Sequence, residues 1–178
     1  MRMGTAILLL LAVAPVTAAS AESPSERVYD LIDARLELMR PVAAWKDARG
    51  VAVEDRAREA VVLEKAVQAA GESGIEPESA AAFFLSQIEA AKEIQFCWLA
   101  RWEMGTATPP EEVPDLKAEF RPQLIRIGAD LLSATQESLA TEAAFTRAGF
   151  QSAVQVDCLS EATRDGLFEP LSAMRLAP

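Results

Sequence analysis

The segment ARLELMRPVAAWK, residues 34–46, has the 3.6-residue periodicity of an amphipathic helix, but charged residues stand on its apolar side. Arg35 and Lys46 are eleven residues apart, which is three turns plus about 20°, so they fall on one line with a rise of about 16 Å between them. Either both side chains extend from the edge of the core into water, or their ends grip a small ligand between them. The same line contains Val28, Leu31, Leu38 and Val42.

The whole chain has 178 residues, of which 51% are hydrophobic, and this length and composition suit one domain. Residues 1–21 resemble a signal peptide: a basic start, an apolar run over residues 6–13, and small residues at 19–21. The apolar run is too short to span a bilayer. We therefore expect cleavage after Ala21, a periplasmic or secreted product with no membrane association, and one all-helical domain over residues 22–178.

Export bears on the two cysteines, Cys97 and Cys158, because an oxidising compartment favours pairing. The sequence allows two alternatives for this pair, a disulfide or two buried free thiols. The formal charge of −10 argues against nucleic acid as a partner. The chain has no histidine, which excludes histidine-based triads and histidine metal ligands, and we predict no metal and no cofactor.

The remaining pattern is helical, and the sequence predicts an all-α, single-domain helical bundle. A capping box at residues 23–26 opens the first helix, and Pro41 predicts a kink near Glu37. Gly149 and Gly166 are expected to break the C-terminal part into short segments. The expected helices cover about 23–49, 53–70, 77–102 and 115–140, with a linker at 105–114.

Charged and polar residues recur on the predicted inner faces of the next two helices. Asp55, Arg58 and Glu59 stand at i, i+3 and i+4, which is equally consistent with a solvated face. Gln95 shares a stripe with Ala91, where an amide could equally satisfy a core carbonyl. Together with Arg35 and Lys46 they would suit a ligand with several carboxylates and a hydroxyl. No nucleophile with a base beside it accompanies them, which favours a reaction assisted by electrostatics and shape alone. The stripe of the third helix is Ala81, Phe84, Ile88, Ala91, Gln95, Leu99 and Trp102.

These spacings resemble the all-helical, AroQ-type chorismate mutases, and the leader points to their exported subclass. The family pattern is an Arg, a Lys eleven residues later, an Asp nine after that, an Arg three further on, and a Gln or Glu in the third helix. Arg35, Lys46, Asp55 and Arg58 meet these spacings, and Gln95 follows within QIEAAKEIQF. The resemblance extends over about residues 28–132, and further agreement comes from PVAAWK at 41–46, IEPE at 75–78 and the proline-rich break before Asp115.

The resemblance implies the cofactor-free rearrangement of chorismate to prephenate, in the biosynthesis of phenylalanine and tyrosine precursors, by a homodimer. It assigns the substrate carboxylates to Arg35 and Arg58, and the ether oxygen of the breaking bond to Lys46 and Gln95. Asp55 and Glu59 would orient the ring hydroxyl. Because Gln95 donates at any pH whereas a Glu must first be protonated, activity should be nearly independent of pH around neutrality.

The chain departs from the family at two positions. Ala91 stands in the substrate-binding site where relatives often have Ser or Thr. Asp130 occupies the place of an additional Arg from the C-terminal half, and Arg126, one turn earlier, is the candidate to replace it. The alternative function is a non-catalytic exported helical module that binds a small dicarboxylate or a partner helix.

Overall fold

The computed structural model describes residues 23–178, so the predicted signal peptide at 1–21 lies outside the described residues. Within that range the chain is helical, without strands apart from one isolated bridge between Ile75 and Leu176. The predicted all-α fold is confirmed. The elements are α1 (Pro24–Glu37), α2 (Met39–Asp47), α3 (Arg56–Glu72), α4 (Pro77–Glu103), the π-helical turn η1 (Leu116–Phe120), α5 (Arg121–Ala140), α6 (Arg147–Ala153) and α7 (Glu161–Ser172).

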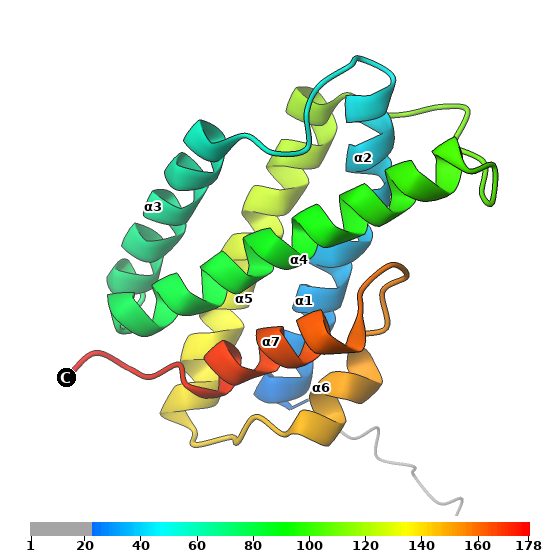
Figure 1. Ribbon diagram of the computed structural model, residues 1–178. Coiled ribbons are helices and arrows are strands. Elements are labelled where there is room, and N and C mark those ends of the chain that lie inside the picture. Colours follow the sequence, from blue (N-terminus) through cyan, green and yellow to red (C-terminus); the bar gives the residue numbers. More distant parts are fainter. Residues whose placement is uncertain (1–22) are drawn as a thin grey trace, which may run out of the picture.

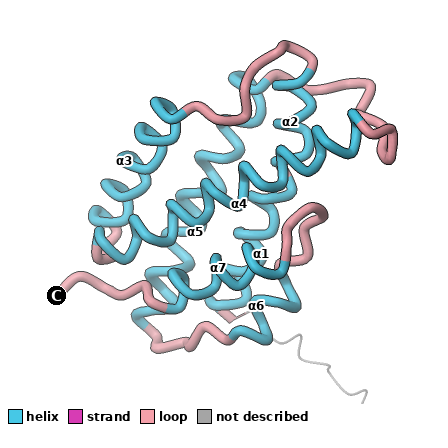
Figure 2. Tube along the Cα trace, in the orientation of Figure 1, coloured by secondary structure: helices cyan, strands magenta, loops and turns pink. Residues whose placement is uncertain are grey.

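The helices form two layers that cross each other (Figures 1 and 2). In one layer α1 and α2 follow each other end to end, and α5 runs antiparallel along α1. In the other layer the long helix α4 crosses them, with α3 antiparallel beside its first half and α7 packed against it. The core between the layers is a single cluster whose largest members include Ile32, Leu36, Phe83, Ile94, Leu131, Phe150, Leu167 and Leu171.

The first predicted helix divides into two at Leu38. Ser23 and Glu26 form the expected capping box at its start. Pro41 has no N–H to offer the carbonyl of Glu37, and its ring would clash with that carbonyl in a regular helix. The predicted irregularity near Glu37 is therefore confirmed, and it is a break between α1 and α2 rather than a bend within one helix.

The start of α3 and the buried face of α4 differ from the sequence-based expectation. The helix expected from about residue 53 begins at Arg56, because Asp55 is its N-cap residue and has a non-helical backbone. The face of α4 is also rotated: Phe84 and Gln95 are buried as predicted, but Ala81, Ile88, Ala91, Leu99 and Trp102 are only partly buried. The physical reason is that α4 packs against elements on two sides, which buries Ala80, Phe83, Gln87, Ala90, Ile94 and Trp98 as well.

The fourth predicted helix begins with a widened turn. Arg121 donates its backbone N–H to the carbonyl of Leu116, five residues earlier. Pro122 follows directly, and in a regular α-helix its ring would clash with the carbonyl of Ala118. The widened turn η1 relieves that clash, and it adds one residue to the turn, which shifts the facing of every later side chain of α5.

The predicted breaks at Gly149 and Gly166 are wrong, because both residues lie inside helices, α6 and α7. Gly149 leaves room for two neighbouring side chains: an added Cβ would lie 3.0 Å from the Cε2 atom of Tyr29 and 2.9 Å from the Oγ1 atom of Thr146. The glycine thus allows α6 to approach α1 closely, and Tyr29 accepts a hydrogen bond of 2.7 Å from the backbone N–H of Thr146.

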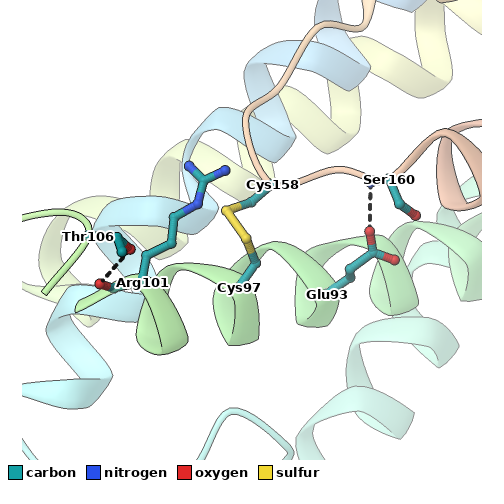
Figure 3. Close-up of a disulfide and its surroundings, with 6 residues drawn as sticks. All are labelled: Glu93, Cys97, Arg101, Thr106, Cys158 and Ser160. Carbon is teal, nitrogen blue, oxygen red and sulfur yellow. Dashed lines mark hydrogen bonds between the residues drawn. A yellow bond between two sulfur atoms is a disulfide. The ribbon is translucent and has the colours of Figure 1, made fainter. Parts of the chain in front are cut away.

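Cys97 and Cys158 form a disulfide, with their Cα atoms 5.7 Å apart, so the free-thiol alternative is wrong (Figure 3). The bond joins α4 to the segment that leads into α7. Nearby, the carboxylate of Glu93 accepts a hydrogen bond of 2.7 Å from the backbone N–H of Ser160 and another from the hydroxyl of Thr163. Two attachments one turn apart on α4 therefore fix the start of α7.

Candidate active site

The seven predicted site residues come from four consecutive elements. Arg35 lies on α1, Lys46 near the end of α2, and Asp55 at the cap of α3. Arg58 and Glu59 lie in the first turn of α3, and Ala91 and Gln95 in the middle of α4.

Gln95 connects α4 to the line of side chains on α1 and α2. Its side chain is buried, and the Nε2 atom donates to the carbonyl of Ala91 at 2.9 Å and to the Sδ atom of Met39 at 3.6 Å. Met39, the first residue of α2, is four residues after Arg35 and seven before Lys46. The spacing of seven puts Met39 and Lys46 on one side of α2, whereas the break at Leu38 separates Met39 from Arg35. The amide of Gln95 therefore contacts the chain at a residue that lies between the two cations in the sequence.

The two hydrogen-bonding atoms of the Gln95 amide are satisfied unequally. A thioether sulfur is a weak acceptor, so one N–H of Nε2 is held only loosely by Met39. The Oε1 atom is buried and has no partner among residues 23–178. The amide can thus exchange its sulfur contact for a stronger acceptor at little cost. The alternative, that Gln95 satisfies a core carbonyl, is supported by one hydrogen bond, which Gln95 donates to the carbonyl of Ala91 one turn earlier in α4.

Lys46 is partly buried, and its Nζ atom donates a hydrogen bond of 2.9 Å to the carbonyl of Val53. Burial lowers the pKa of Lys46, the carboxylates of Asp55 and Glu59 act to raise it, and Arg121 acts to lower it. Two acids and a second cation thus act on the ammonium through space. Two of its three N–H donors are left for a ligand.

Asp55 and Glu59 cap the N-terminus of α3 through two hydrogen bonds, each to a backbone N–H group. The Oδ1 atom of Asp55 accepts from the backbone N–H of Arg58 at 2.9 Å, and the backbone N–H of Asp55 donates to the Oε1 atom of Glu59 at 3.1 Å. The contact between Asp55 and Arg58 is thus a cap made to the backbone. The side chain of Glu59 is partly buried, whereas Asp55 and Arg58 are exposed.

Arg35 is a partly buried cation. Burial lowers the pKa of its guanidinium, and no carboxylate within residues 23–178 lies within 4.0 Å of it. A desolvated guanidinium without an acidic partner is a favourable place for an anionic ligand. The sequence alone could not distinguish this from a side chain that reaches into water.

The structure does not bring all seven residues into direct contact. Lys46, Asp55 and Glu59 form one group, and Gln95 and Ala91 form another that meets α2 at Met39. Within residues 23–178 no hydrogen bond or ion pair links the side chain of Arg35 or Arg58 to either group. Two hollows lie elsewhere, a small one of about 40 Å³ beside Trp98 and one of about 220 Å³ between α6 and α7.

Two functional candidates were missed by the sequence. Arg121 is partly buried at the start of α5 and influences Lys46, whereas Arg126 and Asp130 are exposed. The widened turn η1 bears on the choice between Arg121 and Arg126, because it shifts the facing of α5 from that of a regular helix counted along the sequence. Lys92 was the second omission: its Nζ atom lies 3.4 Å from the Oε2 atom of Glu59, and no spacing rule in the sequence pointed to a contact between these two helices.

Neither a metal cluster nor a membrane span accompanies these residues. Across residues 23–178, no group of three or more acidic or cysteine side chains could hold a metal ion, and no helix is long and apolar enough to cross a bilayer. Fold and candidate site together define a class of protein: a helical bundle in which buried or partly buried hydrogen-bond donors and cations lie on successive helices, a combination suited to a small anionic ligand.

Comparison with known proteins identifies the family within that class. Residues 25–96 match the family described as chorismate mutase type II. A monofunctional chorismate mutase of Enterobacter agglomerans is 32% identical over 81% of this chain and 80% of its own length. A secreted chorismate mutase of Mycobacterium tuberculosis is 32% identical over 62% of this chain and 58% of its length.

Solved structures agree with the sequence relatives. The secreted chorismate mutase of Yersinia pestis has a TM-score of 0.79 and 26% identity, covering 84% of this chain and 97% of that one. A chorismate mutase of Burkholderia thailandensis has a TM-score of 0.67 and 28% identity over 84% of this chain and 97% of that one. The chain belongs to the chorismate mutase family, and the predicted family is confirmed.

Proposed function

We propose that this chorismate mutase converts chorismate to prephenate in a site formed by α1, α2, the start of α3 and α4, using its side chains to stabilise charge in the transition state. The observation that carries the proposal is the contact of the buried Gln95 amide with Met39, a residue that lies between Arg35 and Lys46 in the sequence. It supports a single ligand reached by one neutral donor and two cations.

The proposed chemistry requires no group to be gained or lost. The reaction is a unimolecular rearrangement in which the ether C–O bond breaks while a C–C bond forms within the same molecule. Negative charge grows on the ether oxygen as the C–O bond lengthens. Donors aimed at that oxygen bind the transition state more tightly than the substrate, which is the condition for acceleration.

Lys46 and Gln95 are the proposed donors to the ether oxygen. The Lys46 ammonium has two N–H groups left after its bond to Val53, and the Gln95 amide has one N–H held only by sulfur. Both lie in partly or fully buried positions, where electrostatic interactions are stronger than in water. By analogy with oxyanion donors, removal of either should cost about 100-fold or more in rate.

The remaining residues bind and orient the substrate. Arg35 and Arg58 are assigned to its carboxylates, because a guanidinium can hold a carboxylate with two parallel hydrogen bonds. Asp55 and Glu59 keep free lone pairs on the oxygens that cap α3, and we assign them to the ring hydroxyl. Ala91 contributes no side-chain hydrogen bond. Holding the enolpyruvyl arm over the ring adds rate through orientation.

Arg121 is our candidate for the additional cation of the C-terminal half, in place of Arg126. Arg121 is partly buried and its charge acts on the pKa of Lys46, whereas Arg126 is exposed. A second cation near Lys46 would balance Asp55 and Glu59 when a dianionic substrate enters.

Export and dimer formation are further parts of the proposal. Three relatives are named secreted chorismate mutases, which supports a periplasmic or secreted protein, and residues 1–21 are the proposed signal peptide. The disulfide between Cys97 and Cys158 is consistent with an oxidising compartment. The homodimer rests on the family resemblance.

The test uses the oxidised mature chain, residues 22–178, with fresh chorismate. Loss of chorismate absorbance faster than the uncatalysed rearrangement, with prephenate as the product by chromatography, is the expected result. Absence of turnover at micromolar enzyme, with the helical circular dichroism spectrum intact, would sink the proposal and favour a non-catalytic binding module.

A further inference from the structure

Lys92 lies on α4 directly after Ala91 and joins α4 to the start of α3. Its Nζ atom is 3.4 Å from the Oε2 atom of Glu59 and 2.8 Å from the Oε1 atom of Glu89. The side chain of Lys92 is only 16% exposed, and that of Glu59 only 23%. This ion pair therefore lies between helices and is largely withdrawn from water.

We propose that Lys92 is a positioning residue: it holds the carboxylate of Glu59 against α4 and thereby keeps Glu59 from pairing with the ammonium of Lys46. The inference rests on the proposed function, in which Lys46 donates to the substrate.

The hydrogen bonds of Glu59 support this role. The Oε1 atom accepts from the backbone N–H of Asp55 at 3.1 Å, and the Oε2 atom faces Lys92. One carboxylate oxygen of Glu59 is thus bound to the cap of α3, and the other is bound to α4. Glu59 is nevertheless close enough to Lys46 to act on its pKa, as Asp55 is from the same side and Arg121 from the start of α5.

Without Lys92, the carboxylate of Glu59 would lose its neutralising partner in a poorly solvated position. An unpaired charge there is unfavourable, so the side chain would turn to another cation. Lys46 is the cation on which Glu59 already acts. An ion pair between them would occupy the N–H donors of Lys46 that the transition state requires.

The second partner of Lys92 provides a matched control. Glu89 contacts the same ammonium at a shorter distance, but its side chain is 59% exposed. Exposed pairs contribute little because water screens them. Glu89→Gln therefore removes a charge from Lys92 without releasing Glu59, and it leaves the proposed site unchanged.

The activity test compares Lys92→Met, Lys92→Arg, Glu89→Gln, Glu59→Gln and the double variant Lys92→Met/Glu59→Gln, each with an intact helical spectrum. We expect Lys92→Met to lower kcat about 10-fold, a coupling typical of contacting charged groups, with a smaller change in KM. Lys92→Arg should restore the rate, and Glu89→Gln should match the wild type. In the Glu59→Gln background, Lys92→Met should cost almost nothing, because the competing carboxylate is gone.

A readout independent of turnover separates this inference from the proposed function. The pH dependence of amine labelling at Lys46, followed by mass spectrometry, reports the pKa of its ammonium. Lys92→Met should raise that pKa, since Glu59 then pairs with Lys46, and Glu59→Gln should abolish the rise. If Lys92→Met changes neither labelling nor kcat, or if its effect persists in full without Glu59, the inference is wrong. Lys92→Gln replaces Lys92→Met should the latter not fold.

Discussion

The ammonium of Lys46 donates a hydrogen bond of 2.9 Å to the carbonyl oxygen of Val53, two residues before the residue that caps α3. This bond fixes a long, flexible side chain at the end of α2 and at the same time holds the loop that carries Asp55. The direction of the proposed catalytic donor and the position of the α3 cap therefore depend on each other.

The first prediction is that Lys46→Met lowers kcat by about 100-fold or more, because it removes one of two donors to the ether oxygen. The methionine side chain keeps most of the buried stem. Steady-state kinetics on chorismate measure the loss, and circular dichroism verifies the fold. Lys65→Met, at an exposed position of α3, is the control and should leave turnover unchanged; an active Lys46→Met variant would refute the assigned role.

The second prediction concerns pH. Burial, opposed in part by Asp55 and Glu59, lowers the pKa of Lys46, so its ammonium deprotonates below the usual lysine value of about 10.4. Because the protonated form is the donor, kcat/KM should stay level through neutrality and then fall on the alkaline side. A bound dianion stabilises the ammonium, so the alkaline fall of kcat should come at higher pH than that of kcat/KM.

The third prediction tests Gln95 through the same profile. A buried carboxyl at this position has a raised pKa and donates only when it is protonated. Gln95→Glu should therefore retain activity at acidic pH and lose it as pH rises, in contrast to the level wild-type profile. Rates measured over a range of pH in constant ionic strength make the comparison, and an unchanged profile in Gln95→Glu would remove Gln95 from the reaction.

The identity of the additional cation gives the fourth prediction. Arg121→Gln should raise KM about 10-fold, the scale of a lost hydrogen bond to a charged group, because Arg121 is partly buried near Lys46. Arg126→Gln, at an exposed position of the same helix, serves as the matched variant and should bind chorismate like the wild type. The reverse order of effects would return the role to Arg126.

The contrast between Arg121 and Arg126 illustrates how far the sequence could lead. Hydrophobic periodicity and caps are local signals, and they placed the break after Glu37, the long helix α4 and the proline-rich linker correctly. The direction in which the side chains of α5 point is not determined by local signals of this kind. One widened turn before Pro122 rotates everything beyond it. Pro122 is visible in the sequence and indicates an irregularity, but it does not determine whether the helix kinks, breaks or widens there.

The site was predictable to the extent that it depends on helical spacing. Arg35, Lys46 and Gln95 were singled out because a charge or an amide on an apolar stripe is visible in the sequence, and in the structure Gln95 contacts Met39, which lies between the other two in the chain. Asp55 was assigned to a helix although it caps one, since capping and helical interior share the same residue types at the first turn. Lys92 was missed because its partner Glu59 is 33 residues away on another helix.

The last prediction concerns the disulfide between Cys97 and Cys158. A covalent link between residues 61 positions apart restricts the unfolded chain, and in the chain-entropy account such a loop is worth about 4 kcal/mol. Cys97→Ser/Cys158→Ser should therefore lower Tm by roughly 10 °C for a domain of this size, because α7 is then held to α4 by packing and the Glu93 hydrogen bonds without the covalent link.

Kinetics and calorimetry together distinguish a stabilising disulfide from a catalytic one. Cys97 follows Gln95 by two residues, which on a helix is about 200°, so the disulfide and the amide point to nearly opposite sides of α4. The serine variant should keep the wild-type kcat and KM at 25 °C while it unfolds at lower temperature, and the reduced wild-type protein should behave in the same way. A loss of kcat without a loss of Tm would mean that the disulfide acts on Gln95 through α4, and not on the attachment of α7.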